Sequence, residues 1–305
     1  MGKIVVLGSL NMDLIIRMPR LPAAGETVLG GDLATALGGK GANQAVAAAR
    51  LGGAVTMIGR VGTDAYGQAQ RAALQAAGID AQWLVSDPQA PTGVAFILLE
   101  ETGQNSIVVS PGANHRLTLG DVRAAQSALE GAACLVMQLE TPLDAVMEAA
   151  SQAARKGVRV VLNPAPARPL PALLLSNVDT LILNETEASL LTGLSVDGDD
   201  AIRQAGRKLL EQGPHCVVLT LGSRGAFWMT AQRSGFVPAF EVQVVDTTAA
   251  GDAFVGAFAV ALAEGVSEDE AARFACAAGA LATTRLGAQP SLPTRAEVTI
   301  LLQRS

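Results

Sequence analysis

The sequence is poor in aromatic residues and cysteines, and it has no excess of positive charge. Only 3% of its 305 residues are aromatic, and its cysteines are Cys134, Cys216 and Cys276. An odd number of widely spaced cysteines does not form a disulfide framework or a metal site, so we expect buried thiols in a reduced compartment. With a net charge of −6, the sequence lacks the excess of basic residues by which proteins bind nucleic acid or anionic membranes.

Long apolar runs are also missing, although half of the residues are hydrophobic. We find no uninterrupted apolar run of about 18 residues, so we expect no membrane-spanning helix. The first residues enter a predicted strand at once and lack the layout of a signal peptide, and Val6 stands where a myristoylation signal has Ser or Thr. We therefore expect a cytoplasmic protein without a membrane partner.

The chain does contain a regular alternation of predicted strands and helices. Apolar, β-branched runs predict buried strands at 4–7 and 55–59, with helices at 44–51 and 66–77. Further strands are predicted at 133–138, 158–162, 179–183 and 215–220, two edge strands in 225–245, and helices at 142–156, 186–192, 199–212, 251–264 and 268–284. This rhythm predicts an α/β fold with a doubly wound, mostly parallel sheet flanked by helices, whose ligands bind at the carboxyl ends of the strands.

Two segments interrupt this alternation. Residues 13–18 and 27–33 are predicted as short strands separated by glycines and prolines. Residues 92–100 and 105–110 are predicted as a hairpin with its turn at 101–104. These strands predict a small accessory sheet, inserted from about 11–34 and 92–110.

The stretch DTTAAGDAFVGAF at 246–258 combines an anion-binding backbone with an acid. Its small residues precede a predicted helix, and the free amides of a first helical turn attract anions. Asp252 lies at the edge of this nest. A carboxylate there suits a general base that takes a proton from a hydroxyl while the amides hold the charge of a transferred group. Asp252 as a simple helix cap is the alternative reading.

Polar residues near the N-terminus indicate a second binding region. The run GGKG at 38–41 lacks the first Gly and the final Ser or Thr of a P-loop, but it places Lys40 and Asn43 on the first turn of a helix. Asn11 and Asp13 stand two apart, so both side chains point to one face of an extended segment and can hold vicinal sugar hydroxyls. The alternative for GGKG is a tight strand-to-helix connection with a solvated Lys40. The alternative for Asn11 and Asp13 is a turn or cap signal.

Three further polar turns follow predicted strands. Glu140 comes directly after an apolar strand and is either a ligand-binding residue or a helix cap. The run NETE at 184–187 suits Mg²⁺ reached through waters, and equally a capping box. The turn at 220–225 can wrap a nucleotide phosphate or be an ordinary turn. Because all of these turns lie at carboxyl ends of strands, one crevice can collect them.

Two motifs resemble the signatures of the ribokinase-like carbohydrate kinases of the phosphofructokinase-B type. They are GGKGANQAVA at 38–47 and DTTAAGD at 246–252, and the similarity covers essentially the whole chain. Shorter matches are GSLNMD at 8–13, MQLE at 137–140, NPAPA at 163–167, NETE at 184–187 and GAQPS at 287–291. The resemblance implies a single α/β domain over residues 1–305 with a small β-sheet lid, through which such proteins often form homodimers.

The resemblance also implies a role for each matching residue. The catalytic group would be Asp252 with an anion hole at Ala250, Gly251 and Asp252. The sugar would be held by Asn11, Asp13, Gly39, Lys40, Asn43, Glu140 and Asp252. ATP would contact Asn184, Thr220, Leu221, Gly222, Ser223, Arg224, Gly225, Gly251 and Cys276, with Glu187 acting on Mg²⁺ through water. A monovalent cation, K⁺, would be surrounded by Asp246, Thr248, Ala282, Arg285, Gly287 and Ser291, mainly through backbone carbonyls.

From these residues we expect an ATP-dependent kinase that phosphorylates D-ribose at O5. Cys276 departs from the polar residue that such kinases can carry near the adenine, which leaves the base contacts open. A kinase for another pentose, deoxyribose, a nucleoside or a hexose is the nearest alternative. A sugar-binding protein without catalysis is the alternative from another class.

Overall fold

Apolar strands form the centre of a nine-stranded sheet in the computed structural model, which describes residues 2–100, 102 and 105–304. The strand order is β13-β12-β11-β10-β9-β8-β1-β4-β5, and every pair from β11 to β5 is parallel, while β12 and β13 are antiparallel additions at one edge. The strands are β1 Lys3–Leu7, β4 Ala54–Gly62, β5 Asp80–Asp87, β8 Ala132–Met137, β9 Arg159–Leu162, β10 Thr180–Asn184, β11 Cys216–Thr220, β12 Ala226–Thr230 and β13 Ser234–Val237.

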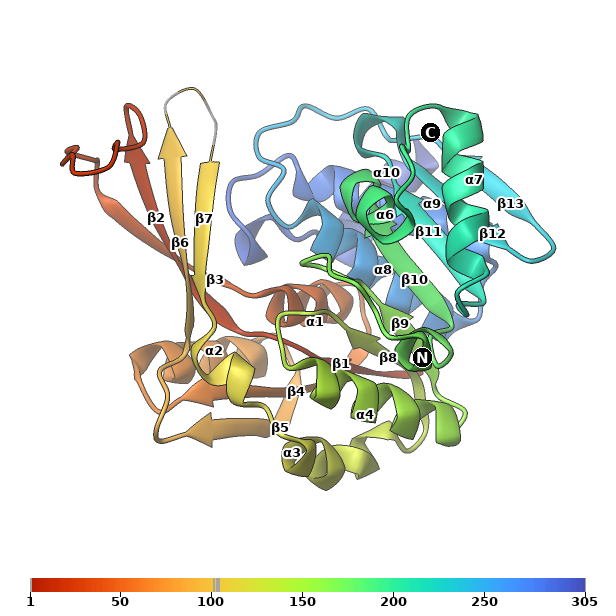
Figure 1. Ribbon diagram of the computed structural model, residues 1–305, viewed down its shortest axis with the longest axis horizontal. Helices are drawn as coiled ribbons and strands as arrows, with labels where there is room; N and C mark the ends of the chain where they lie inside the picture. The colour runs from red at the N-terminus through yellow and green to blue at the C-terminus, as the bar shows by residue number, and fades with distance from the viewer. Residues whose placement is uncertain (1, 101, 103–104, 305) are drawn as a thin grey trace.

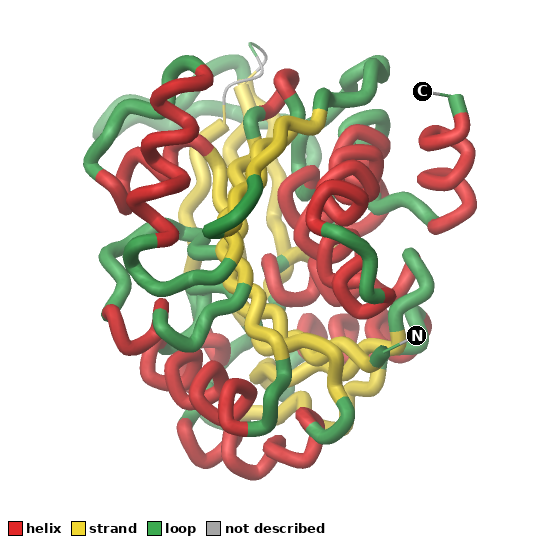
Figure 2. Tube along the Cα trace, turned by 90° about the vertical axis from the view of Figure 1, so that its right-hand side faces the viewer, coloured by secondary structure: helices red, strands yellow, loops and turns green. Residues whose placement is uncertain are grey.

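Helices cover both faces of this sheet, as Figure 2 shows for the strands that run between two layers of helices. Alternate residues of β1 serve the two faces: Ile4 and Val6 pack in one core, and Val5 and Leu7 in the other. The first core includes residues from α1 Lys40–Arg50, α2 Ala65–Ala76, α8 Ala250–Glu264, α9 Glu268–Ala282 and α10 Arg295–Gln303. The second includes residues from α3 Leu119–Ala124, α4 Leu143–Arg155, α5 Ala172–Leu175, α6 Glu185–Thr192 and α7 Asp199–Leu210. The predicted doubly wound fold is confirmed.

Most predicted elements form within a few residues of their expected bounds, and the exceptions have local causes. The strand predicted at 27–33 is wrong, because this segment has no regular structure and the strand begins only at its last residue, as β3 Leu33–Gly38. β5 was not predicted, since as an edge strand it alternates polar and buried residues. The expected edge strands in 225–245 end at Val237. The predicted turn at 101–104 lies, apart from Thr102, outside the described residues.

The second sheet has four strands and projects from the side of the first, at the left of Figure 1. Its order is β3-β2-β6-β7, with β2 Asn11–Met18, β6 Gly93–Glu100 and β7 Asn105–Ser110. The register pairs Asn11 with Gly38 on one side and with Gly93 on the other. The beginning of β2, which carries Asn11 and Asp13, therefore lies at the base of this sheet, beside the large one.

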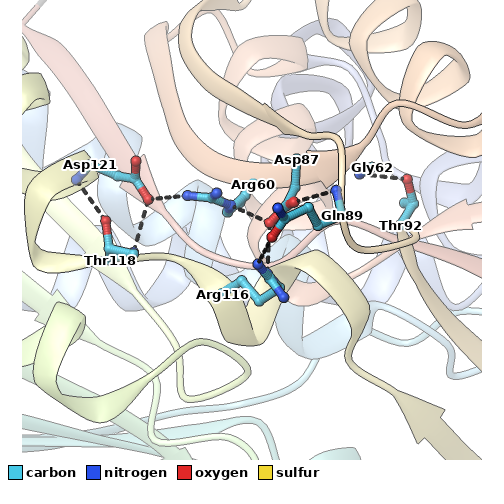
Figure 3. Close-up of polar contacts among 8 residues, drawn as sticks. All are labelled: Arg60, Gly62, Asp87, Gln89, Thr92, Arg116, Thr118 and Asp121. Carbon is cyan, nitrogen blue, oxygen red and sulfur yellow. Dashed lines mark hydrogen bonds and ion pairs between the residues drawn. The ribbon is translucent and has the colours of Figure 1, made fainter.

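A group of ion pairs holds the base of the small sheet against β4. Figure 3 shows Arg60 of β4 between two carboxylates, with 2.9 Å from its Nε to Asp87 Oδ2 and 2.7 Å from its Nη1 to Asp121 Oδ2. Asp87 Oδ2 also pairs with Arg116 at 2.8 Å, and Asp87 is only 1% exposed. Arg116 follows β7, and Asp87 precedes β6. These contacts therefore anchor two of the crossings between the sheets, the one from β5 to β6 and the one that follows β7.

Helices α1 and α8 approach closely where α8 carries Gly256. A Cβ at this position would lie 2.7 Å from the Cβ of Ala47 and 2.8 Å from the carbonyl oxygen of Gln44. Only glycine permits this approach, which aligns the first turns of the two helices. In the described part of the chain, no helix is long and apolar enough to cross a membrane.

Candidate active site

Asp252 lies in the first turn of α8, where two amide side chains of α1 hold its carboxylate. Asn43 Nδ2 donates to Asp252 Oδ2 at 2.9 Å, and Gln44 Nε2 donates to Asp252 Oδ1 at 3.0 Å. Asp252 is 8% exposed. The cap of α8 is Ala249, in the left-handed conformation with φ 58° and without a side-chain hydrogen bond. Asp252 is therefore inside the helix and does not occupy the cap position that the alternative reading gave it.

Two of the first amides of α8 are without hydrogen-bond partners in the part of the chain that the structure describes. Among the described residues, the amides of Gly251 and Asp252 have no hydrogen-bond acceptor, whereas Ala250 N donates to Thr247 O at 3.2 Å. A Cβ added at Gly251 would meet nothing within 4 Å. Two unpaired amides at a helix N-terminus form an arrangement that stabilises an anion.

A cavity of about 140 Å³ opens beside these amides and collects residues from six elements or their ends. Lys40 of α1 and Asp252 of α8 line it together with residues from the carboxyl ends of β10 and β11 and from the segment after β9. The other lining residues are Asn163, Ala165, Ile182, Leu183, Asn184, Glu187, Thr220, Ala249, Gly251 and Val255. The carboxyl ends of the parallel strands thus meet at one cavity, as the order of the predicted elements indicated.

Asn11, Asp13 and Glu140 form the polar region beside Lys40, where a sugar was expected. Burial, reinforced by the charges of Glu140 and Asp252, raises the pKa of Asp13 from 3.8 to about 7. A Cβ at Gly38 would lie 2.3 Å from Asp13 Oδ2, so the strand beside Asp13 has room only for a glycine. The region where we expect the sugar therefore contains carboxylates whose negative charges repel one another.

Three hydrogen bonds orient the side chains of this polar region. Ser9 Oγ donates to Glu140 Oε2 at 2.5 Å, and the same oxygen accepts from the backbone amide of Lys40 at 3.2 Å. The cap of α4 is Pro142, so Glu140 does not have the capping role of the alternative reading. Asn114 Nδ2 donates to Asn11 Oδ1 at 2.7 Å. This bond leaves the amide nitrogen of Asn11 available for a ligand.

Lys40 is the cation that lines the cavity. Burial on its own would lower the pKa of Lys40, but the charges of Asp252, Glu140 and Glu187 raise the pKa above its ordinary value. The side chain therefore stays protonated among these three carboxylates. A fixed positive charge at this place suits a ligand that carries negative charge, such as a phosphoryl group.

Asn184 and Glu187 cap α6 and face the cavity at the same time. Asn184 Oδ1 accepts from the Glu187 amide at 2.8 Å, and Asn184 N donates to Glu187 Oε2 at 2.9 Å. Burial raises the pKa of Glu187, and the Asn184 amide and Lys40 act against this rise. The second carboxylate oxygen of Glu187 is not part of the capping box, so the capping box and a water-mediated contact to Mg²⁺ are compatible.

The turn after β11 borders the cavity only through its first residue, Thr220. Leu221 N donates to Gly225 O at 2.8 Å, which closes the turn, and Arg224 pairs with Glu185 at 2.5 Å. Gly222 and Ser223 are exposed. Cys276 of α9 is 7% exposed, packs in the hydrophobic core and is not among the residues that line the cavity.

The residues expected around a monovalent cation belong to two adjacent loops. Asp246 Oδ1 accepts from the amide and hydroxyl of Thr248, and Asp246 Oδ2 accepts from Gly287 N at 2.9 Å. Partial burial of the Asp246 carboxyl acts to raise its pKa, but these hydrogen bonds outweigh the burial and lower the pKa. Both Val245 N and Asp246 N donate to Thr283 O. Ala282 and Ser291 are buried, and Arg285 pairs with Glu297. The Asp246 carboxylate lies between these loops, and a carboxylate is a ligand that suits a hard cation.

Several residues of the site were not recognised from the sequence. Gln44 and Gln138 lie inside motifs that were noted, but their side chains gave no signal of their own. Asn114 lies in a short helix, Gly112–Arg116, whose position beside β2 depends on the tertiary fold. Ser9 lies in the match GSLNMD at 8–13, but its side chain gave no signal of its own. Among the described residues, no group of three or more His, Cys, Asp or Glu side chains is arranged to hold a metal.

The chain is similar to known proteins along its whole length. The chain is 44% identical over 302 residues to a ribokinase of Haemophilus influenzae, which covers 99% of each chain. It is 38% identical over 292 residues to a deoxyribokinase of Salmonella typhi, which covers 95% of each. The structure of Arabidopsis thaliana ribokinase complexed with ribose and ATP is similar, with a TM-score of 0.92 and 37% identity, over 100% of this chain and 99% of that one. Residues 1–295 match the pfkB family of carbohydrate kinases, and the chain belongs to this family.

Proposed function

We propose that the protein phosphorylates D-ribose at O5 with ATP. The observation that carries this proposal is the position of Asp252, which borders the cavity at the start of α8 beside Lys40 and two unpaired amides. The similarity to ribokinases along the whole chain supports ribose as the acceptor.

Asp252 acts as the general base in this proposal. Its carboxylate takes the proton of the O5 hydroxyl while this oxygen attacks the γ-phosphoryl group of ATP, and the bond to the β-phosphate oxygen breaks. The amides of Gly251 and Asp252, with that of Ala250 once its weak bond to Thr247 opens, hold the charge of the transferred group. The charge of Lys40 lies across the cavity and supports the same group.

The sugar would lie over the polar region between β2 and α1. Carboxylates and amides there offer acceptors and donors for the other hydroxyls of a pentose, and Asn43 Oδ1 is buried without a partner. Such an unpaired acceptor gains a hydrogen bond when a hydroxyl arrives. The residues that we assign to the sugar are Asn11, Asp13, Gly39, Lys40, Asn43, Glu140 and Asp252.

The nucleotide would occupy the side of the cavity next to β10 and β11. We assign Asn184, Gly251 and the turn Thr220, Leu221, Gly222, Ser223, Arg224 and Gly225 to it, with Cys276 near the base. Glu187 would reach Mg²⁺ through water, because one of its oxygens is free of the capping box. When bound, Mg²⁺ supplies positive charge to the phosphate oxygens and takes its remaining ligands from phosphates and water.

K⁺ would bind between the loops at 246–248 and 282–291. The residues assigned to it are Asp246, Thr248, Ala282, Arg285, Gly287 and Ser291. Because Thr247 connects Asp246 to the N-terminus of α8, an ion there would fix the backbone that carries the anion-binding amides. We expect K⁺ to raise kcat for this reason.

A phosphotransferase assay over a panel of sugars and nucleosides tests the assignment. We expect the highest kcat/KM with D-ribose, full activity only with Mg²⁺, and a higher rate with K⁺ than without. The absence of turnover on D-ribose would overturn the proposal. Because a relative at 38% identity is a deoxyribokinase, 2-deoxyribose is the decisive competitor. A pocket that hydrogen-bonds the 2-hydroxyl rejects the analogue lacking it by a large factor.

We further propose that two copies pair through the small sheet, in the cytoplasm where ATP is present. Both faces of this sheet expose apolar side chains: Leu33, Phe96, Ile107, Val108 and Val109 are 44–64% exposed. Exposed apolar surface of this kind marks an interaction site, and a self-complementary patch favours a symmetric pair. Sedimentation equilibrium should give twice the chain mass, and Val108→Lys should give the monomer. A monomeric wild type would contradict the pairing.

A further inference from the structure

Gln44 and Gln138 form a buried relay of amides that ends on Asp252. Gln138 Nε2 donates to Gln44 Oε1 at 2.6 Å, and Gln44 Nε2 donates to Asp252 Oδ1 at 3.0 Å. Gln44 is 1% exposed and Gln138 is fully buried, and they come from α1 and from the residue after β8. Neither side chain lines the cavity.

The direction of this relay follows from the chemistry of its last member. An ionised carboxylate only accepts hydrogen bonds, so Gln44 must turn its nitrogen toward Asp252 and its oxygen away. The oxygen then needs a donor, which Gln138 supplies. Gln44 Nε2 makes a second bond, to Asn163 Oδ1 at 3.1 Å, and Asn163 in turn donates to Ile182 O at 2.9 Å. Each amide thus has one orientation that satisfies its neighbours.

The relay leaves one buried polar atom unpaired. Gln138 Oε1 has no partner among the described residues, and a Cβ at Gly8 would lie only 2.0 Å from it. An apolar side chain of similar shape would remove this unpaired acceptor. A buried acceptor without a partner costs stability, and Gln152 Oε1 of the control variant below is unpaired in the same way, so the two variants are matched in this respect.

We propose that Gln44 is a positioning residue for catalysis, held in its active orientation by Gln138. Asn43 and Gln44 fix one carboxylate oxygen each, so the carboxylate plane of Asp252 cannot turn about its last side-chain bond. A general base must present a lone pair to the hydroxyl within a narrow range of distance and angle, and small misplacement lowers the rate steeply. The inference rests on the role of Asp252 in the proposed function.

Kinetics of single and double variants test this role. We expect Gln44→Met to lower kcat by about tenfold to a hundredfold with a nearly unchanged KM for the sugar. Gln138→Met should lower kcat by a smaller factor, because Gln44 keeps its bond to Asn163. Gln152→Met is the matched control: Gln152 is a buried glutamine of α4 on the opposite face of the sheet, and its loss should leave kcat unchanged.

The double variants separate positioning from general stability. If Gln44 acts through Asp252, adding Gln44→Met to Asp252→Asn costs no further factor in kcat, and adding Gln138→Met to Gln44→Met costs none either. The proposal would be overturned if Gln44→Met lowered kcat by the same factor in the wild type and in Asp252→Asn. It would also be overturned if Gln44→Met alone left kcat unchanged. All rates are taken with the panel sugar that the wild type phosphorylates fastest. If D-ribose is not a substrate, the wild type itself shows this. That result is distinct from relay variants that keep the kcat of the wild type.

Thermal unfolding of each variant shows whether the fold is kept. Should Gln44→Met unfold, Gln138→Met still tests the relay from another element, because it leaves both partners of Asp252 in place. A folded Gln138→Met with wild-type kcat would then contradict the role of the relay.

Discussion

The side-chain amide of Asn43 donates a hydrogen bond of 2.9 Å to the carboxylate of Asp252, a residue 209 positions later in the chain. The bond joins the two motifs that suggested a carbohydrate kinase, and it lies where the first turns of α1 and α8 meet. Because each helix contributes its N-terminus, the positive ends of both helix dipoles point to the same region. An acid and an anion-binding backbone can act there on one substrate.

Replacing Asp252 with Asn tests its role as general base. We expect Asp252→Asn to fold and to bind the sugar, because Asn43 can turn its unpaired Oδ1 toward the new amide. The rate kcat should fall by at least about a hundredfold, the usual scale for the loss of a general base. Steady-state kinetics with ribose and ATP, together with sugar binding by calorimetry, give the two readouts. Near-normal turnover would show that another group removes the proton.

The crossing of α1 and α8 predicts a sharp difference between two glycine variants. In Gly256→Ala the new Cβ would lie 2.7 Å from Ala47 and 2.8 Å from the Gln44 carbonyl, so the helices must separate. We expect a loss of about 1–3 kcal/mol in the free energy of unfolding, typical of overpacking, and a lower kcat because Asn43 and Gln44 move away from Asp252. Chemical denaturation and kinetics measure both.

Gly120 provides the control for this variant. It lies in the exposed first turn of α3, where a Cβ would make only one contact, at 3.4 Å to Thr118 Oγ1. We expect Gly120→Ala to keep kcat and to be at least as stable as the wild type, since alanine favours helix. Equal effects of the two variants would mean that the helix crossing is not the cause.

The sequence allowed prediction of those parts of the fold that depend on local patterns. Buried parallel strands are continuous apolar runs, and Gly-rich segments before helices mark the strand ends, so the large sheet and the region of Lys40 and Asp252 could be placed. β3 could not, because Leu33–Gly38 has no continuous apolar run and half of its residues are exposed, so that only pairing with β2 defines it as a strand.

Contacts that arise only from the tertiary fold were beyond sequence reasoning. Gln138 and Gln44 are 94 positions apart, and Asn114 and Asn11 are 103 positions apart. A glutamine or asparagine in a single sequence carries no sign of its partner, since amides are mostly found on the surface. The Asp13 carboxyl gave no sign of its raised pKa either, because that shift depends on burial and on neighbours from other elements.

The raised pKa of Asp13 predicts a pH dependence of sugar binding. Below about pH 7 the carboxyl is protonated and above it is charged. A carboxylate accepts stronger hydrogen bonds from hydroxyls than a neutral acid does. The KM for the sugar should therefore fall as the pH rises through about 7, and Asp13→Asn should remove this dependence. A KM that does not change between pH 6 and pH 8, a window of about one unit on each side of the pKa, would contradict the prediction.

The same shift predicts the sign of the effect on stability. Because the pKa is 3.8 before folding and about 7 after it, the folded protein binds more protons at this group between these values. The contribution of Asp13 to the free energy of unfolding is therefore largest at low pH and is lost as the pH rises through about 7. The free energy of unfolding of Asp13→Asn, relative to that of the wild type, should therefore be higher at pH 8 than at pH 5. Denaturant titrations at the two pH values measure this difference.

Asn114 is expected to act on the sugar through Asn11. It is buried, and its side chain makes three hydrogen bonds: Oδ1 accepts from Leu10 N, and Nδ2 donates to Leu10 O and Asn11 Oδ1. In Asn114→Ala the Asn11 amide is free to turn, so we expect KM for the sugar to rise by about tenfold, the equivalent of one lost hydrogen bond, with a smaller change in kcat. Asn177→Ala, which removes an exposed asparagine bonded to Leu173 O, should leave both constants unchanged. If kcat fell while KM stayed constant, Asn114 would act on the chemical step and not on the position of Asn11.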